Sequence, residues 1–184
     1  MLQQKKQPAI WEVIQRKSVF EHPFLTVNME KVRLPGGEVI SDWPKVYSGD
    51  FVNAVVLNEN NEVMILEGYK HGLEMFSWQV VGGYLEEGED PVTAVQRELL
   101  EETGFHTNEW LYLGSFILDA NRHMGIGHYF CGRNATQITE PNHDDLEAFG
   151  VKWVSLKEAK YALLDGRIAG TSYAINMALA LLML

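Results

Sequence analysis

Short apolar runs separated by polar turns dominate the middle of the chain and predict a β-rich core. Two valine-rich runs, 51–57 and 63–69, flank a polar turn at 58–61 and indicate buried strands of a central sheet. Further strands are expected at 77–81, 110–118, 126–133 and 149–155, and helices at 156–164 and 171–184. These elements predict an α/β (α+β) fold in which a mixed β-sheet is sandwiched between α-helices.

The first fifty residues form a separate pattern. Residues 11–20, 25–34 and 38–43 are typical of strands, and Pro35, Gly36 and Gly37 provide the tight turn of a hairpin. A ribbon of two or three strands is marginal by itself, so it is expected to lie on its own domain or on a second subunit. We therefore predict an N-terminal β-ribbon over residues 1–48 and a main domain over residues 49–184.

The segment from residue 83 to residue 105 predicts a capped helix with an acidic face. Asp90 followed by Pro91 is a good helix start, Gly104 is a good stop, and about 13 residues lie between them. At roughly 100° per residue, three glutamates fall on one face, at 0°, about −60° and about +40°; these are Glu98, Glu101 and Glu102. A neighbouring stripe of Val92, Val95 and Leu99 is expected to bury against the sheet.

Three carboxylates on one helical turn repel one another unless a cation joins them. Clustered oxygen ligands suit a hard divalent ion, Mg²⁺ or Mn²⁺. The alternative interpretation is an acidic face that is merely solvated.

The same segment carries a longer motif, G-x5-E-x7-R-E-U-x-E-E-x-G-U, in which U is a bulky apolar residue. Its fixed positions are filled by Gly83, Glu89, Arg97, Glu98, Leu99, Glu101, Glu102, Gly104 and Phe105. This pattern resembles the Nudix box of hydrolases that split a nucleoside diphosphate linked to another group. The resemblance implies that Glu98 and Glu102 ligate metal directly, that Glu101 shares the ions, and that a backbone carbonyl of Gly82 or Gly83 contributes. It also implies an ion pair between Arg97 and Glu89 that supports the loop against the helix.

Outside the box, the chain resembles the ADP-ribose pyrophosphatase branch of this family. The shared features are the N-terminal ribbon, the basic pair Lys70 and His71, and a loose pattern over residues 165–178. The branch implies a homodimer that exchanges its N-terminal strands. It also implies a nucleotide-sugar substrate, cleaved to a nucleoside monophosphate and a sugar phosphate.

Three departures from the branch leave the substrate open. Gln79 stands where the branch has a glutamate, Lys70 replaces an arginine, and Ala120 occupies a position that is often proline. Hydrolysis of another nucleoside diphosphate derivative or of an oxidised nucleotide is an alternative. A further alternative is a sensor of nucleotide sugars that no longer catalyses hydrolysis.

Several single residues are candidates for the reaction or for substrate binding. The resemblance places a general base at Glu147, in a polar loop after the box, with Glu101 as the second choice. Trp43 either stacks on a base or packs in the hairpin, and Arg122 and His123 either contact phosphate or ribose or are plain surface groups. Lys70 is expected to bind the substrate through its charge.

Net charge and cysteine content limit which binding partners and which cellular compartment are expected. The 184-residue chain has a net charge of −10, which argues against a nucleic-acid partner but leaves room for a small anionic substrate beside a metal ion. Cys131 is the only cysteine, which suits a reducing cytoplasm. No signal peptide and no membrane-spanning segment are expected.

Overall fold

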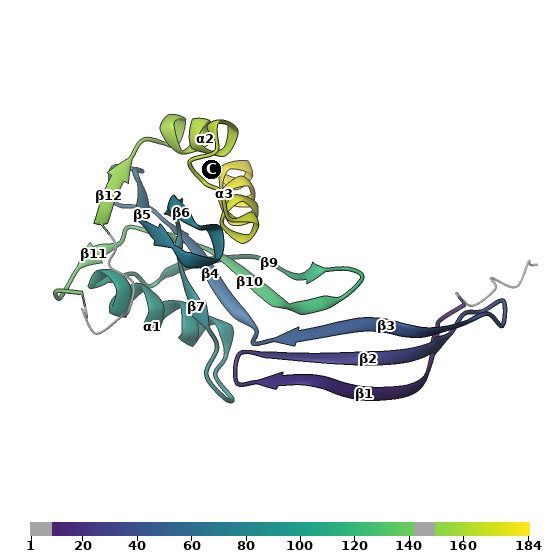
Figure 1. The fold of residues 1–184 in the computed structure, drawn as a ribbon. Coiled ribbons are helices and arrows are strands. Elements are labelled where there is room, and N and C mark those ends of the chain that lie inside the picture. The colour runs from purple at the N-terminus through teal and green to yellow at the C-terminus, as the bar shows by residue number, and fades with distance from the viewer. Residues whose placement is uncertain (1–8, 142–149) are drawn as a thin grey trace, which may run out of the picture. The chain divides into compact units, whose positions relative to one another are not determined.

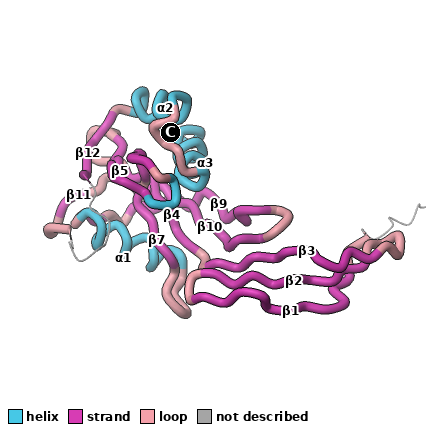
Figure 2. Tube along the Cα trace, in the orientation of Figure 1, coloured by secondary structure: helices cyan, strands magenta, loops and turns pink. Residues whose placement is uncertain are grey.

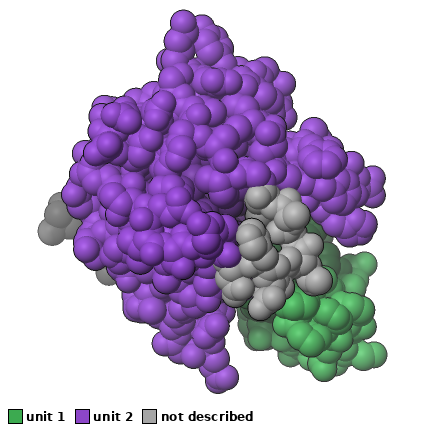
Figure 3. All heavy atoms as spheres, turned by 90° about the vertical axis from the view of Figure 1, so that its left-hand side faces the viewer, with its two compact units in different colours: residues 1–49, 119–125 green, residues 50–118, 126–184 purple. Residues whose placement is uncertain are grey.

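The computed structural model describes residues 9–141 and 150–184, and it divides into two compact units. Unit 1 comprises residues up to 49 together with 119–125, and unit 2 comprises residues 50–118 and 126–184 (Figure 3).

Unit 1 is built on a three-stranded antiparallel ribbon, shown in purple and blue in Figure 1. Its strands are β1 (Glu12–His22), β2 (Leu25–Arg33) and β3 (Val39–Ser48). The β1–β2 register runs from Glu12 opposite Arg33 to His22 opposite Leu25. Every residue of β1 is exposed, so this edge strand buries little of its apolar surface within the chain.

Unit 2 contains a mixed sheet in which parallel and antiparallel pairs meet at β4 (Phe51–Val56). β10 (His123–Arg133) runs parallel to β4, and β7 (Val81–Tyr84) runs antiparallel to it on the other side. β9 (Glu109–Asp119) pairs with β10. A second sheet has the order β12 (Gly150–Val154), β5 (Val63–Lys70) and β6 (Met75–Gln79), and a short pair joins β8 (Phe105–His106) to β11 (Thr136–Gln137).

Helices cover both faces of these strands in unit 2 (Figure 2). One apolar core gathers Val52, Ala54 and Val56 of β4 with residues of α1 (Pro91–Thr103). The other gathers Val55 and Leu57 with residues of α2 (Leu156–Asp165) and α3 (Thr171–Met183). The alternation along β4 therefore sends successive side chains to opposite cores, as expected for a strand buried on both faces.

The predicted fold class is confirmed, and most predicted elements lie within two or three residues of their observed bounds. The expected strand at 77–81 is instead two strands, because β6 ends at Gln79 and β7 begins at Val81. Periodicity also missed β8, β11 and a short 3₁₀ turn, η1 (His71–Leu73), since each is too short to show a period. Within the described residues, no helix is both long and apolar enough to cross a membrane.

Candidate functional site

The acidic helix α1 is fixed at both ends by the residues that its sequence predicts. The Asp90 carboxylate accepts hydrogen bonds from the backbone N–H groups of Val92 (3.0 Å) and Thr93 (3.4 Å). The pKa of Asp90 is lowered, first by the hydroxyl of Thr93 and then by the Val92 N–H. Gly104 ends the helix with a φ of 72°, in the left-handed region that glycine accepts without strain.

The apolar side of α1 holds its polar face in a defined orientation. Ala94, Val95 and Leu99 are fully buried in the core that also contains Val81. The prediction that Val92 belongs to this buried stripe is wrong. Val92 lies in the first turn of the helix, and its side chain is exposed.

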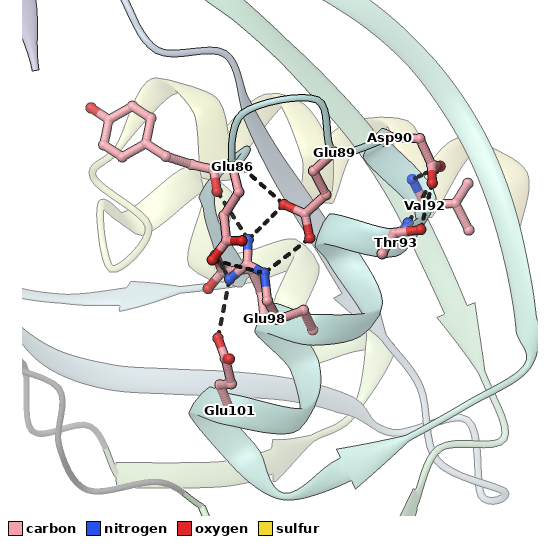
Figure 4. Close-up of polar contacts among 9 residues, drawn as sticks. Glu86, Glu89, Asp90, Val92, Thr93, Glu98 and Glu101 are labelled. Atoms are coloured by element: carbon pink, nitrogen blue, oxygen red, sulfur yellow. Dashed lines mark hydrogen bonds and ion pairs between the residues drawn. The ribbon is translucent and has the colours of Figure 1, made fainter.

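Arg97 is the centre of the polar face. Its Nε and Nη2 donate to the two carboxylate oxygens of Glu89 at 3.0 and 2.9 Å, and Nη2 also donates to the Tyr84 carbonyl at 3.1 Å. Its Nη1 donates to Glu98 Oε1 at 2.7 Å and to Glu101 Oε2 at 3.1 Å. One guanidinium thus ties the loop before the helix to two carboxylates on the helix (Figure 4).

This network shifts both of its main partners in the direction that favours their charged forms. The bidentate contact with Arg97, followed by the backbone N–H of Glu86, holds the pKa of Glu89 below its usual range. The pKa of Arg97 is raised, chiefly by Glu89. The ion pair expected between Arg97 and Glu89 is therefore present, with the geometry in which a planar guanidinium matches a carboxylate.

Gly83 leaves room for the carboxylate of Glu98. A Cβ built on Gly83 would overlap the Glu98 carboxyl group, because α1 brings that group directly against the backbone of β7. The Glu98 side chain is only 13% exposed, whereas that of Glu101 is 47% exposed. Glu98 is therefore held in place on two sides, by Gly83 and by Arg97, while Glu101 is open to solvent.

Glu102 is fixed from the strand side. Its Oε2 accepts a hydrogen bond of 3.1 Å from the backbone N–H of Gly82. A Cβ at Gly82 would overlap the side-chain amide of Asn53, the residue opposite Gly82 on β4. The two glycines thus let β7 pass between the α1 carboxylates and the neighbouring strand.

The donor set suits a hard cation, since Glu98, Glu101, Glu102 and the backbone of Gly82 and Gly83 offer oxygen ligands only. Over residues 9–141 and 150–184, no three ligating side chains are gathered tightly around one point. The guanidinium of Arg97, bonded to both Glu98 and Glu101, supplies the positive charge there. Because Gly83 has no side chain, the backbone of β7 leaves space for the Glu98 carboxylate beside it.

The other candidate residues are distributed over both units. Lys70 ends β5 in unit 2. Trp43, Arg122 and His123 belong to unit 1, where Arg122 contacts Asp119 at 3.4 Å. Glu147 lies outside the described residues.

Trp43 faces a cavity of its own unit. Its ring packs edge-on against that of Trp11, with the two ring centroids 5.1 Å apart, and its Nε1 donates to the Asn121 carbonyl at 3.2 Å. A cavity of about 350 Å³ is lined by both tryptophans together with Lys45, Glu30 and other residues of unit 1. Trp43 therefore packs in the ribbon and also lines this cavity. The stacking of a base on its ring stays a prediction.

Sequence reasoning missed two contributors to the Arg97 network. The carbonyl of Tyr84 carries no side-chain signal. Glu86, whose N–H donates to Glu89 at 3.0 Å, occupies a position of the motif that any residue can fill, so only the loop geometry identifies it.

Comparison with known proteins assigns this arrangement to a family. A model described as the NUDIX domain matches residues 49–173, and one described as the nucleoside diphosphate sugar hydrolase N-terminal domain matches residues 11–46. The chain therefore belongs to the Nudix family, and it is a hydrolase acting on pyrophosphate bonds.

Individual relatives carry different names. A CMP-5'-(N-acetyl-N-hydroxy-3-aminopropyl)phosphonate hydrolase of Streptomyces rubellomurinus is 27% identical, covering 86% of this chain and 76% of the relative. An ADP-ribose pyrophosphatase of Bacillus subtilis is 25% identical over 90% of both chains. A methanol dehydrogenase activator of Bacillus methanolicus is 31% identical, covering 73% of this chain and 76% of the relative.

A solved structure described as an ADP compounds hydrolase superposes with a TM-score of 0.81 at 16% identity, covering 95% of this chain and 94% of the other. That likeness shows the fold. The resemblance drawn from the sequence motifs is confirmed at the level of the family and of its ADP-ribose pyrophosphatase-like members.

Proposed function

We propose that this chain is a metal-dependent pyrophosphohydrolase that cleaves the diphosphate of ADP-ribose or a related nucleotide sugar. The products are a nucleoside monophosphate and a sugar phosphate. The observation that carries the proposal is the Glu98 carboxylate, held against Gly83 and paired with Arg97 beside Glu101. Such a fixed, largely desolvated acid beside the exposed Glu101 suits a site that binds a cation and a phosphate together.

Glu98, Glu101, Glu102 and a carbonyl of Gly82 or Gly83 are the residues that would hold Mg²⁺ or Mn²⁺. A divalent ion, when bound, neutralises phosphate charge and lowers the pKa of a bound water. Arg97 holds the acids in position through Glu89, so both residues act as supports. Glu147 is the first candidate for the general base. Glu101, the more exposed of the two α1 acids that contact Arg97, is the second.

The relatives support a nucleotide substrate without fixing its base or its second group. One is named for a CMP-linked phosphonate and one for ADP-ribose. The match of residues 11–46 to the nucleoside diphosphate sugar hydrolase N-terminal domain favours a nucleotide sugar.

A substrate panel tests the proposal. The protein is incubated with ADP-ribose, other nucleotide sugars, a CMP-phosphonate and an oxidised nucleoside triphosphate, with Mg²⁺, with Mn²⁺ and with EDTA. We expect a nucleoside monophosphate from ADP-ribose or another nucleotide sugar, and no product in EDTA. Saturable binding without turnover of any compound would instead identify a sensor.

The carboxylate roles are tested by matched glutamines. Glu102→Gln and Glu98→Gln should each lower kcat at least about 100-fold, the upper end of what changes around metal ligands cost. Both should weaken Mn²⁺ binding in calorimetry while leaving the circular dichroism spectrum unchanged. Glu87→Gln removes the same charge from an exposed residue of the adjoining loop and should alter neither quantity. Near-normal turnover in Glu102→Gln contradicts the metal assignment.

We also propose a homodimer formed through the N-terminal ribbon. β1 is exposed over its whole length and includes large apolar residues such as Val13, Ile14, Val19 and Phe20. A long exposed apolar edge strand is a ready site for pairing with another chain. The double variant Ile14→Glu, Val19→Glu should run as a monomer in light scattering, whereas Gln15→Glu, also on β1, should stay dimeric. A monomeric wild type contradicts this proposal.

A further inference from the structure

The outer face of α2 and α3, remote in sequence from the box, carries an apolar groove. Its volume is about 600 Å³, and seven apolar side chains and two lysines line it. Three of the leucines also pack against the core between the helices and the sheet, so core packing holds the residues at the base of the groove in place. Both helices belong to unit 2, and Figure 1 shows them next to each other.

The exposure of two leucines shows that the groove is open to solvent. Leu164 at the end of α2 is 78% exposed and Leu182 near the end of α3 is 81% exposed. Neither contributes to the core, so folding alone does not require an apolar residue at either position. A contiguous apolar patch of this kind on a soluble domain marks a binding surface more often than chance.

The charged side chains that line the groove are both lysines. Lys157 and Lys160 line it together with Leu164, because positions i, i+3 and i+7 of a helix share a face. No acidic residue lines the groove, and among the described residues neither lysine takes part in an ion pair. In a chain whose net charge is −10, this is a local basic rim around an apolar floor.

We propose that this groove binds an amphipathic helix of another protein, with leucine-like anchors on one face and acidic residues beside them. A concave apolar groove between two helices fits the ridge of a third helix. The two lysines supply the charge that acidic flanks would complement, and beyond about 8 Å at physiological salt the overall negative charge is screened. The proposal does not depend on the substrate of the hydrolase.

Two other occupants fit the groove less well. A two-fold dimer centred on the groove brings the lysines of both copies to one interface, with no acidic group of the groove to offset them. A membrane surface is flat and would meet the rim without filling the groove.

Synthetic peptides test the proposal. The probe is a helix-forming peptide of about 18 residues, long enough to be helical, with leucines at i, i+3, i+4 and i+7 and glutamates on the flanks. A second peptide has lysines on the flanks, and a third has the first composition in permuted order. Binding to the full chain is measured by fluorescence anisotropy and located by NMR chemical-shift changes. We expect the glutamate-flanked peptide to bind best and to shift resonances of α2 and α3.

Variants of exposed residues complete the test. Leu164→Gln with Leu182→Gln should weaken binding at least about tenfold, as truncating interface anchors does. Lys157→Glu with Lys160→Glu should reverse the preference to the lysine-flanked peptide. Ile117→Gln with Ile138→Gln, exposed outside the groove, is the control pair and should change nothing. All variants should keep wild-type turnover.

The proposal is overturned by any of three results. Equal binding of the permuted peptide would show non-specific adhesion. Self-association that Leu164→Gln with Leu182→Gln abolishes would assign the groove to a second copy. Co-sedimentation with phosphatidylcholine vesicles that the same pair abolishes would assign it to lipid.

Discussion

The helices α1 and α3 have the same length, 13 residues, but they are stabilised in different ways. α1 begins at an Asp90 cap, ends at a left-handed Gly104 and carries four charged residues, among which Arg97 engages the preceding loop and Glu102 engages the neighbouring strand. α3 has no side-chain cap at its start and no Asp, Glu, Lys or Arg along its length. It is held by burial of residues such as Met177 and Ala180.

The two helices meet two different structural requirements of this hydrolase. α1 needs an apolar side that packs and a polar side whose carboxylates stay in fixed positions. Local signals and a dense hydrogen-bond network provide that fixed geometry. α3 needs only to cover the opposite core, and apolar contacts provide most of this, together with a buried hydrogen bond of 3.0 Å from the Asn176 side-chain amide to the Phe130 carbonyl.

The largest expected effect on stability comes from α3. Met177→Ala removes a fully buried side chain from the core shared with Val55 and Ile65, and it should cost about 2–5 kcal/mol of unfolding free energy. Urea denaturation measures this loss, and turnover per folded molecule should stay at the wild-type value. Leu182→Ala, at an exposed position of the same helix, should cost little. A loss below about 1 kcal/mol for Met177→Ala would show that α3 is not held by core packing.

The next effect concerns the contact between the Glu98 carboxylate and the backbone of Gly83. Gly83→Ala places a Cβ where the Glu98 carboxylate lies, so it should displace that acid and reduce kcat at least about 100-fold. Mn²⁺ binding measured by calorimetry should weaken in parallel. Gly72→Ala is the control, because its Cβ would meet nothing within 4 Å. Wild-type turnover in Gly83→Ala would mean that the position of Glu98 is unimportant.

A smaller effect is expected at the start of α1. Asp90→Ala removes the acceptor for the N–H groups of Val92 and Thr93 and should cost about 1 kcal/mol of unfolding free energy. Asp90→Asn keeps an acceptor oxygen and should retain most of this stability. Urea midpoints of the two variants compare them directly, and equal losses would show that the charge of Asp90 matters more than its cap.

The same contrast explains what could be read from the sequence. The bounds of α1 follow from Asp90, Pro91 and Gly104, whose conformational preferences act locally, so the observed helix is the predicted one. The ion pair of Arg97 with Glu89 was expected from the motif and is present. The contact of Glu98 with Gly83 depends on how α1 packs on β7, which no local preference specifies.

Other features depend on tertiary structure in the same way. The break between Gln79 and Val81 changes the sheet to which the chain contributes, although the apolar pattern runs on without interruption. The groove beside Lys157 and Lys160 forms only when α2 and α3 lie side by side. The sequence indicated both helices but not the surface that they make together.

The pH dependence of stability sharpens the comparison further, because α3 has no side chain that titrates in acid, whereas α1 and its preceding loop have several. The pKa of Glu89 is held below its usual range by Arg97 and then by the Glu86 N–H. A carboxylate with a depressed pKa stabilises the fold fully above its unfolded value of about 4.3. That contribution is lost as the pH falls through the folded value.

Glu89→Gln should therefore be less stable than the wild type at neutral pH, and the two should converge as the pH falls below about 4. The deficit of Met177→Ala should stay constant over the same range, since that substitution changes no ionisable group. Urea midpoints collected between about pH 7 and pH 3 for the three proteins measure both trends. A deficit of Glu89→Gln that does not shrink in acid would mean that Arg97 stabilises α1 through hydrogen bonds alone, without a contribution from the charge of Glu89.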